Sequence, residues 1–226
     1  MFGLPGQSLD DFRADLDTLV QLAPDHVSAY ALTIERGTPF GADVRAGRLR
    51  APDDDLQARM FEHAHDALAA AGFAHYEVSS HARPGRRSVH NGLYWTGASY
   101  LGVGAGAASF RPLVDGTGVR FTNPRATDTY LRACARGQGN PQPAKVELRS
   151  REDLEQEALW LALRTADGVD RYAHARRHGH DPLAPAERQS GAAFCERAGW
   201  LTITTASLRL TRAGVLFADE VAVRLA

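Results

Sequence analysis

Residues 8–34 read SLDDFRADLDTLVQLAPDHVSAYALTI, and the two halves of this stretch have different periodicities. Over residues 9–23 apolar side chains recur every three to four positions, which predicts an amphipathic helix. Ser8 is a suitable N-cap, and Asp11, three positions later, can complete a capping box. A proline ends the helical pattern, and the apolar run over residues 26–34 predicts a buried strand. A helix followed by a strand is half of an α/β repeat.

The same order recurs farther along the chain. Three aspartates at residues 53–55 favour a helix N-terminus, and an apolar stripe follows over residues 56–71. Gly72 is a suitable residue to end this helix, and residues 74–79 predict the next strand. Residues 100–110 are small at nearly every other position, which predicts a strand that lines a cavity and is approached closely by another group. Together these segments indicate an α/β fold.

The composition changes after about residue 143, where helical patterns dominate. Three helices, a hairpin and a closing helix are predicted, over residues 152–163, 170–178, 185–198, 200–210 and 213–225. This order is typical of a winged-helix-like domain. The helix that would read DNA carries Arg188 beside Glu187 and Glu196, a mixed charge that is poor for phosphate contact. We therefore favour a packing or partner-docking role for it.

Composition also bounds the class of protein. The chain has 226 residues and a formal net charge of -1, which suits one or two globular units and argues against a nucleic-acid binder. Its cysteines, Cys134 and Cys195, are too few for a disulfide framework or for the three thiolates that hold an iron–sulfur cluster. No run of about 18 apolar residues predicts a membrane span. We expect a cytoplasmic protein, with surface association to membranes left open.

The hexad at residues 90–95 is the polar cluster that points most directly to chemistry. His90 and Asn91 precede Tyr94 and Trp95, directly after a loop of glycine, proline and arginine. An imidazole oriented by an asparagine, with two aromatic faces to cover a planar ligand, is a suitable axial site for haem iron. The alternative is a structural corner, in which His90 and Asn91 satisfy a turn while the aromatic residues pack in the core. Spacing alone favours the corner.

Three other patterns have simpler explanations than binding. Residues 102–107 fit a loose Gly-x-Gly-x-x-Ala dinucleotide pattern, but the helix that this fingerprint requires is interrupted at once by a proline. His174 and His178, with His180 nearby, could share a helix face as ligands of a transition metal. Arginines crowd that segment and disfavour a cation, so a solvated helix end is favoured. A further pair of histidines, at positions 63 and 65, points in two directions from one helix.

Taken in order, the motifs of this chain resemble those of one family of radical S-adenosylmethionine (SAM) proteins. The family contains the haem chaperones of the HemW type and the oxygen-independent coproporphyrinogen III oxidases, and the hexad favours the chaperone branch. The tail motifs LR at 163–164, GVD at 168–170 and LRLT at 208–211 resemble the family's C-terminal domain. The other motifs are GLPGQS at 3–8, YALT at 30–33, ERGTP at 35–39, YEVS at 76–79, ARPG at 82–85, HNGLYW at 90–95 and YLGVGAGA at 100–107.

The resemblance also shows what this chain lacks. In the family, three cysteines near the N-terminus hold a [4Fe–4S] cluster whose open iron binds SAM, and no such motif exists here. The chain therefore resembles only the C-terminal half, a remnant of a partial (βα) barrel followed by the winged-helix-like domain. By motif matching, Ala31 and Ala108 correspond to positions that contact SAM through backbone or van der Waals contact. We do not expect radical catalysis by this chain alone.

The resemblance implies that haem is bound through the hexad, with His90 as iron ligand, Asn91 as its orienting neighbour, and Tyr94 and Trp95 as the pocket wall. The expected function is that of a haem chaperone fragment, which binds haem and passes it to a recipient haemoprotein. A mis-started coproporphyrinogen oxidase-like enzyme and a partner-docking module are the alternatives. An unpaired sheet edge predicts a homodimer, or pairing with a separate N-terminal half. The expected domains are the barrel remnant at 1–110, a connecting segment at 111–145 and the C-terminal domain at 146–226.

Overall fold

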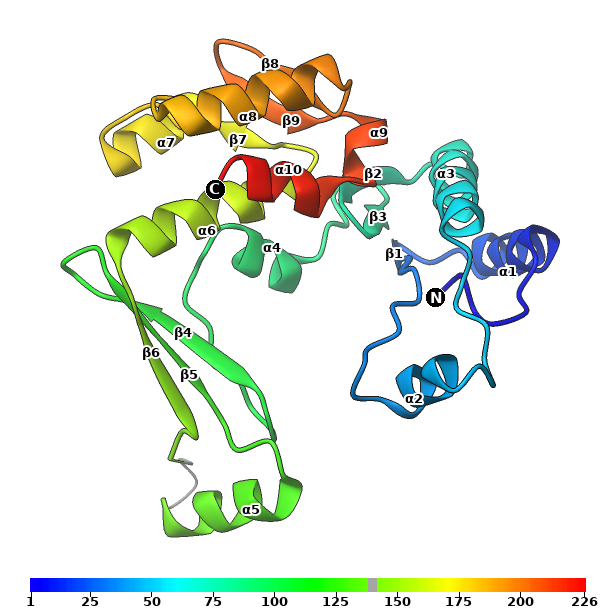
Figure 1. Ribbon diagram of the computed structural model, residues 1–226, viewed down its shortest axis with the longest axis horizontal. Coiled ribbons are helices and arrows are strands. Elements are labelled where there is room, and N and C mark those ends of the chain that lie inside the picture. The colour runs from blue at the N-terminus through cyan, green and yellow to red at the C-terminus, as the bar shows by residue number, and fades with distance from the viewer. Residues whose placement is uncertain (138–141) are drawn as a thin grey trace. The chain divides into compact units, whose positions relative to one another are not determined.

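The computed structural model describes residues 1–137 and 142–226 of the chain (Figure 1). It confirms a mixed α/β fold, and the chain divides into two compact units, Met1–Ser88 and Val89–Ala226. Within the described residues, no strands close into a barrel and no helix is both long enough and apolar enough to cross a bilayer. Each unit is built around its own core.

The first two predicted helices of unit 1 are confirmed. Helix α1 (Leu9–Gln21) begins at the predicted capping box, in which Ser8 Oγ accepts a hydrogen bond from Asp11 N at 3.1 Å. The Asp11 carboxylate accepts in return from Ser8 N at 2.9 Å. Helix α3 (Asp54–Ala70) follows the three aspartates, and a short helix α2 (Pro39–Arg45) precedes it. The capping groups that were recognisable in the sequence therefore set where these helices start.

The strands of unit 1 are shorter than the sequence predicts. They are β1 (His26–Ser28), β2 (Ala74–Glu77) and β3 (Ser80–Ala82), in the sheet order β1-β3-β2 with both pairs antiparallel. The prediction of one strand over residues 26–34 is wrong in length, because β1 pairs with β3 only over residues 26–28. A single further hydrogen bond, from Ala29 N to the Ser79 carbonyl oxygen, continues beyond that pairing. Ala31 makes only an isolated parallel bridge to Phe2. The strand predicted over 74–79 stops at a turn, where the chain doubles back into β3.

Helices α1 and α3 form the core of unit 1 with the N-terminal segment and the sheet. Phe2, Phe12 and Met60 are at most 5% exposed, and the rings of Phe2 and Phe12 lie 5.2 Å apart between centroids. A second group, in which Leu68 and Phe73 pack with Val27 of β1, joins α3 to the sheet. Burying each such side chain stabilises the fold by about 1.5–3 kcal/mol.

Unit 2 begins with helix α4 (Val89–Trp95) and a three-stranded antiparallel sheet, drawn in green in Figure 1. Its strands, in sheet order, are β4 (Ala108–Pro112), β5 (Gly118–Thr122) and β6 (Lys145–Arg149), and helix α5 (Thr127–Arg136) lies between the last two in the sequence. Sequence analysis assigned no secondary structure to the segment 111–145, and residues 138–141 of that segment lie outside the described residues.

The prediction of a strand over residues 100–110 is wrong for most of that stretch. Tyr100 forms a single bridge to Phe110, and the residues between them form a loop that returns on the start of β4. A Cβ on Gly102 would lie 2.1 Å from the carbonyl oxygen of Ala108, so glycine is needed for this close approach. No helix follows the glycines, which agrees with the interpretation that they are not a dinucleotide fingerprint.

The remaining part of unit 2 confirms the predicted order of three helices and a hairpin. The elements are α6 (Arg151–Leu163), β7 (Val169–Asp170), α7 (Arg171–His178), α8 (Ala186–Arg197), β8 (Leu201–Ile203), β9 (Ser207–Leu210), α9 (Arg212–Val215) and α10 (Ala218–Arg224). Their core includes Leu163, Cys195 and Leu208, each at most 1% exposed. Helices α8 and α10 touch at Gly191, where a Cβ would lie 1.9 Å from the Arg224 carbonyl oxygen.

The single closing helix predicted over residues 213–225 is wrong, because the structure has the two helices α9 and α10 there. Gly214 of α9 lies against the Trp200 carbonyl oxygen, 1.8 Å from where a Cβ would be. Phe217 stacks on the Trp200 ring, with centroids 4.4 Å apart and an interplanar angle of 14°. The chain bends between the helices, and both of these residues contact Trp200.

Candidate functional site

The hexad lies on the short helix α4, not in a turn. His90 is exposed, Tyr94 is 36% exposed, and Asn91 and Trp95 are half-buried. The alternative of a structural corner required both aromatic side chains to pack in the core, and Tyr94 does not. The Trp95 indole N–H is buried and has no hydrogen-bond partner among the described residues. Helical geometry brings His90 and Tyr94 together because residues four apart share a face.

Four aromatic rings form a continuous row that starts at the hexad. His90 meets Tyr94 edge to face with centroids 5.1 Å apart, and Tyr94 meets Tyr100 at 4.7 Å. Tyr100 lies 6.3 Å from Phe110, its partner in the β-bridge. These separations lie within the range in which aromatic pairs attract one another. We call His90, Tyr94, Tyr100 and Phe110 the aromatic row; its exposed end carries an imidazole.

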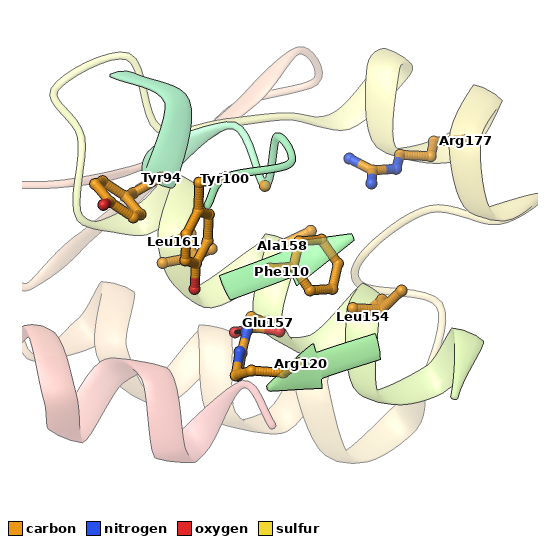
Figure 2. Close-up of a pocket in the computed structure, with 10 residues that line it drawn as sticks. Tyr94, Tyr100, Phe110, Arg120, Leu154, Glu157, Ala158, Leu161 and Arg177 are labelled. Atoms are coloured by element: carbon orange, nitrogen blue, oxygen red, sulfur yellow. Dashed lines mark hydrogen bonds and ion pairs between the residues drawn. The ribbon is translucent and has the colours of Figure 1, made fainter. Parts of the chain in front are cut away.

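The aromatic row borders a small cavity, which Figure 2 shows with Tyr94 and Tyr100 at one end and Arg177 toward the other. The cavity encloses about 90 Å³ and is completed by residues of β5 and α6, among them Arg120 and Glu157. Pockets that enclose a drug-sized ligand measure roughly 300–1,000 Å³. A large planar ligand therefore does not fit inside, and only its edge or a substituent can enter.

A buried ion pair is among the polar groups that line the cavity. Arg120 Nη2 donates to Glu157 Oε1 at 2.5 Å, and both side chains are at least three-quarters buried. Burial lowers the pKa of the Arg120 guanidinium, but the hydrogen bond and charge of Glu157 outweigh burial, so the net pKa is raised. The guanidinium also lies over the Phe110 ring, 5.6 Å from its centroid. This pair fixes the end of the aromatic row in place.

The loop between Tyr100 and Phe110 is clamped by a buried asparagine. Asn123, 7% exposed, donates from Nδ2 to the carbonyl oxygens of Gly102 and Gly104 at 3.1 and 2.9 Å. One amide thus satisfies two backbone acceptors that no sheet partner satisfies. The clamp holds the glycine-rich segment as a loop beside the aromatic row.

The residues predicted to contact SAM lie in different units. Ala31 is an exposed residue of unit 1, at the isolated bridge to Phe2, and Ala108 begins β4 of unit 2. Their shared role stays a prediction. The thiols do not form a cluster-binding set, because Cys134 lies half-buried in α5 and Cys195 is fully buried in α8. Burial raises the pKa of the Cys195 thiol, which disfavours the thiolate that iron requires.

Comparison with known proteins identifies what this arrangement resembles. Residues 150–217 match the HemN C-terminal domain family. The heme chaperone HemW of Mycobacterium tuberculosis strain H37Rv is 38% identical over 228 residues, which cover 98% of this chain and 52% of that protein. This chain is a relative of HemW. The HemW of Bacillus subtilis is 32% identical over 98% of this chain and 56% of its own length.

Relatives of this chain also occur outside bacteria, and a solved enzyme structure has a similar fold. The mitochondrial radical S-adenosyl methionine domain-containing protein 1 of Mus musculus is 38% identical over 75% of this chain. The solved structure of coproporphyrinogen III oxidase (HemN) from Escherichia coli, described as a radical SAM enzyme, matches 99% of this chain with a TM-score of 0.76 at 18% identity. That likeness shows the fold alone. The chain spans about half the length of the HemW relatives and 53% of the enzyme chain.

Sequence reasoning found one end of the aromatic row and missed the other. The hexad motif pointed to His90 and Tyr94, which the structure brings into contact. Tyr100 and Phe110 join the row only because the loop between them folds back into a single bridge. In the single strand that the sequence predicts over residues 100–110, these two residues would lie about 33 Å apart, so no local signal paired them.

Proposed function

We propose that this chain binds haem on the aromatic row, with His90 as the axial ligand of the iron, and passes it to a recipient haemoprotein. The observation that carries this proposal is the contact of the exposed His90 imidazole with a row of aromatic rings that continues from Tyr94 to Phe110. A neutral imidazole nitrogen is a common axial ligand of haem iron. Relatives at 32–38% identity that are named heme chaperones support the same function.

The row supplies the contacts that a planar, apolar macrocycle needs. Tyr94 presents about a third of its surface to solvent beside His90, so a ring bound to the imidazole lies against the phenol. Stacking of this kind contributes about 0.5–1.5 kcal/mol for each aromatic pair beyond burial. Arg177, at the rim of the cavity, offers a positive charge to a carboxylate substituent of the macrocycle. Asn91 and Trp95 retain the proposed roles of orienting neighbour and pocket wall.

Radical SAM chemistry is not part of the proposed activity of these residues. The two thiols present do not fit a [4Fe–4S] cluster, because that cluster needs three thiolates in one loop. In this proposal the residues of the chain bind haem, orient it and release it. The recipient haemoprotein takes haem from the exposed end of the aromatic row.

Haemin titration followed by the Soret band tests the site. We expect His90→Ala to shift the Soret maximum and to weaken binding at least about 10-fold, because a loss of about 1.4 kcal/mol corresponds to a factor of ten. Tyr94→Leu should weaken binding while keeping the Soret maximum, since the iron ligand is retained. The matched control is His63→Ala, which removes a half-buried histidine of α3 that no described contact joins to the row.

Two results contradict the proposal. Identical spectra for wild type and His90→Ala would remove His90 as the ligand. Unchanged affinity in both His90→Ala and Tyr94→Leu would remove the whole aromatic row. Transfer is measured separately by mixing the haem-loaded chain with an apo-globin; a transfer rate that rises with globin concentration indicates direct handover, and a constant rate indicates release into water first.

A further inference from the structure

Three histidines meet in unit 1, which contains no residue of the aromatic row. His65 comes from α3, His75 from β2 and His81 from β3. Their ring centroids lie 5.1 Å apart for His65 and His75, 5.7 Å for His65 and His81, and 4.8 Å for His75 and His81. One nitrogen from each ring can be chosen so that all three lie within 4.8 Å of one another. We call these three residues the histidine triad.

The strand register explains why the rings converge. His81 pairs directly with His75 on one side and with Val27 on the other, and residues directly opposite in antiparallel strands point to the same face. Val27 packs against Leu68 of α3, so this is the face that α3 covers. Helix α3 then supplies His65 to the same layer. Three polar rings therefore occupy an interface between helix and sheet that apolar side chains ordinarily fill.

His81 is the member of the triad that packing alone does not account for. It is 2% exposed, and neither ring nitrogen has a hydrogen-bond partner among the described residues. A buried polar group without a partner costs about 1–3 kcal/mol. Elsewhere in the same sheet polar groups are paired: His26 Nε2 lies 2.7 Å from Tyr76 Oη, and Ser28 Oγ lies 2.9 Å from Ser80 Oγ.

Protonation does not relieve this cost. Burial, with repulsion from the other histidines, lowers the pKa of His81 to about 3. Burial is also the main cause that lowers the pKa of His75. At neutral pH both imidazoles are therefore uncharged, the form in which a ring nitrogen holds the lone pair that a metal ion accepts.

We propose that the histidine triad binds one divalent transition-metal ion of the zinc class, with His65, His75 and His81 as its three protein ligands. Three imidazoles with an open fourth position form a known type of zinc site. Nitrogens on a tetrahedral Zn²⁺ ion are about 3.4 Å apart, given a Zn–N distance of about 2.1 Å. Rotation of the imidazole side chains, without movement of the sheet, is the change that closes the present separation.

A second group, Glu155 with His174 and His180, also brings three potential ligand atoms within 4.8 Å of one another. Its carboxylate, however, is already paired with an arginine. Arg188 Nη1 lies 2.5 Å from Glu155 Oε1, the oxygen that is nearest to His174. A guanidinium in that position neutralises the carboxylate and repels a cation. Among the groups that shift the pKa of His75 and His81, the charged ones are other histidines and Glu77, and none is a guanidinium.

The test is a titration of the full, untagged chain with Co²⁺, whose visible absorption reports four-coordinate nitrogen sites, followed by displacement with Zn²⁺. We expect one equivalent of Co²⁺ to give visible bands that Zn²⁺ abolishes. His81→Phe should remove the bands, because a phenyl ring fills the buried space without a ligand atom. Two matched controls, His63→Ala on the same helix and His174→Gln in the second group, should keep one equivalent.

The proposal fails if wild type gives no bands, or if His81→Phe binds Co²⁺ as wild type does. Folding is checked by circular dichroism, since phenylalanine in β3 is compatible with a strand. If that variant does not fold, His75→Gln in strand β2 replaces it, and loss of the bands is again required. Zn²⁺ should also raise the thermal midpoint of wild type and of both controls, but not that of His81→Phe.

Discussion

The buried ion pair between Glu155 and Arg188 makes the stability of unit 2 sensitive to a single oxygen atom. Their side chains are 12% and 9% exposed, and Arg188 Nη1 donates to Glu155 Oε1 at 2.5 Å. In Glu155→Gln the volume is kept, but a guanidinium is left buried opposite a neutral amide. Removing one partner of a buried pair costs about 3–5 kcal/mol. We expect the lower value, about 3 kcal/mol, because the amide oxygen still accepts a hydrogen bond.

Urea unfolding measures this loss. With a slope of about 2 kcal/mol per molar, a loss of 3 kcal/mol lowers the midpoint by about 1.5 M. The control is Glu220→Gln, which breaks the pair of Glu220 with Arg224 on α10, where the side chains are 46% and 37% exposed. Exposed pairs contribute less than about 1 kcal/mol. If Glu155→Gln lowers the midpoint no more than Glu220→Gln does, the reasoning from burial is refuted.

Lowering the pH should remove the difference in free energy of unfolding between wild type and Glu155→Gln. Burial raises the pKa of the Glu155 carboxyl, but the hydrogen bond and charge of Arg188 outweigh burial, so the pKa lies below its ordinary value of 4.5. A group with a lowered folded-state pKa adds stability above the unfolded pKa and loses it as pH falls through the folded pKa. The two free energies of unfolding should therefore converge below pH 4.5, and parallel curves down to pH 2 would contradict this cause.

Three further predictions concern the close packing at Gly191, the hydrogen bonds of Asn123 and the pKa of His174. Gly191→Ala forces a Cβ against the Arg224 carbonyl oxygen, so the free energy of unfolding should fall by at least about 1–3 kcal/mol, measured in urea. Asn123→Ala removes two hydrogen bonds and should lower it by about 2 kcal/mol, with faster amide exchange confined to the glycine-rich loop. Burial lowers the pKa of His174 below 6.5, so wild type should lose stability as pH falls through 6.5, and His174→Gln should flatten that slope between pH 7.5 and 5.5.

Local chemistry made helices α1 and α3 predictable. The capping residues Ser8 and Asp53 lie next to the helices that they start, so a few neighbouring residues are enough to predict where each helix begins. The strands were overestimated because the length of a strand is set by its partner. Residues 26–34 are apolar enough for a long strand, but β3 offers only three residues to pair with.

In the candidate sites, too, the sequence predicts contacts between near neighbours but not contacts set by a distant partner. His90 and Tyr94 are four apart on one helix, so the sequence could group them. His75 and His81 meet only through an antiparallel register with a bulge, and His65 joins them from a helix that precedes both strands. His63 and His65 are two positions apart on one helix and point in different directions, so the sequence predicts no shared site for them. Nothing in the spacing of the three residues indicates that they meet.

Helix α8 occupies the position of the helix that would read DNA, and the placement of Arg188 explains why it is poorly suited to phosphate contact. The sequence predicts weak phosphate contact from the mixed charge of this helix, and the structure adds that Arg188 is 8% exposed and paired with Glu155. A helix that uses its arginine to hold a core together does not offer that charge to phosphate. The preference for a packing or partner-docking role over DNA reading stays a prediction.

The size of the cavity beside the aromatic row has a kinetic meaning. Under the proposed function, a macrocycle that cannot enter about 90 Å³ would stay on the outer surface with one face in water. It would then leave without a lid having to open, so its residence time would depend on the contacts that it makes with the row. An acceptor protein with an enclosed pocket holds the same macrocycle more tightly. Under the same proposal, the difference in affinity between an open surface site and an enclosed pocket would favour transfer to the acceptor without an external source of energy.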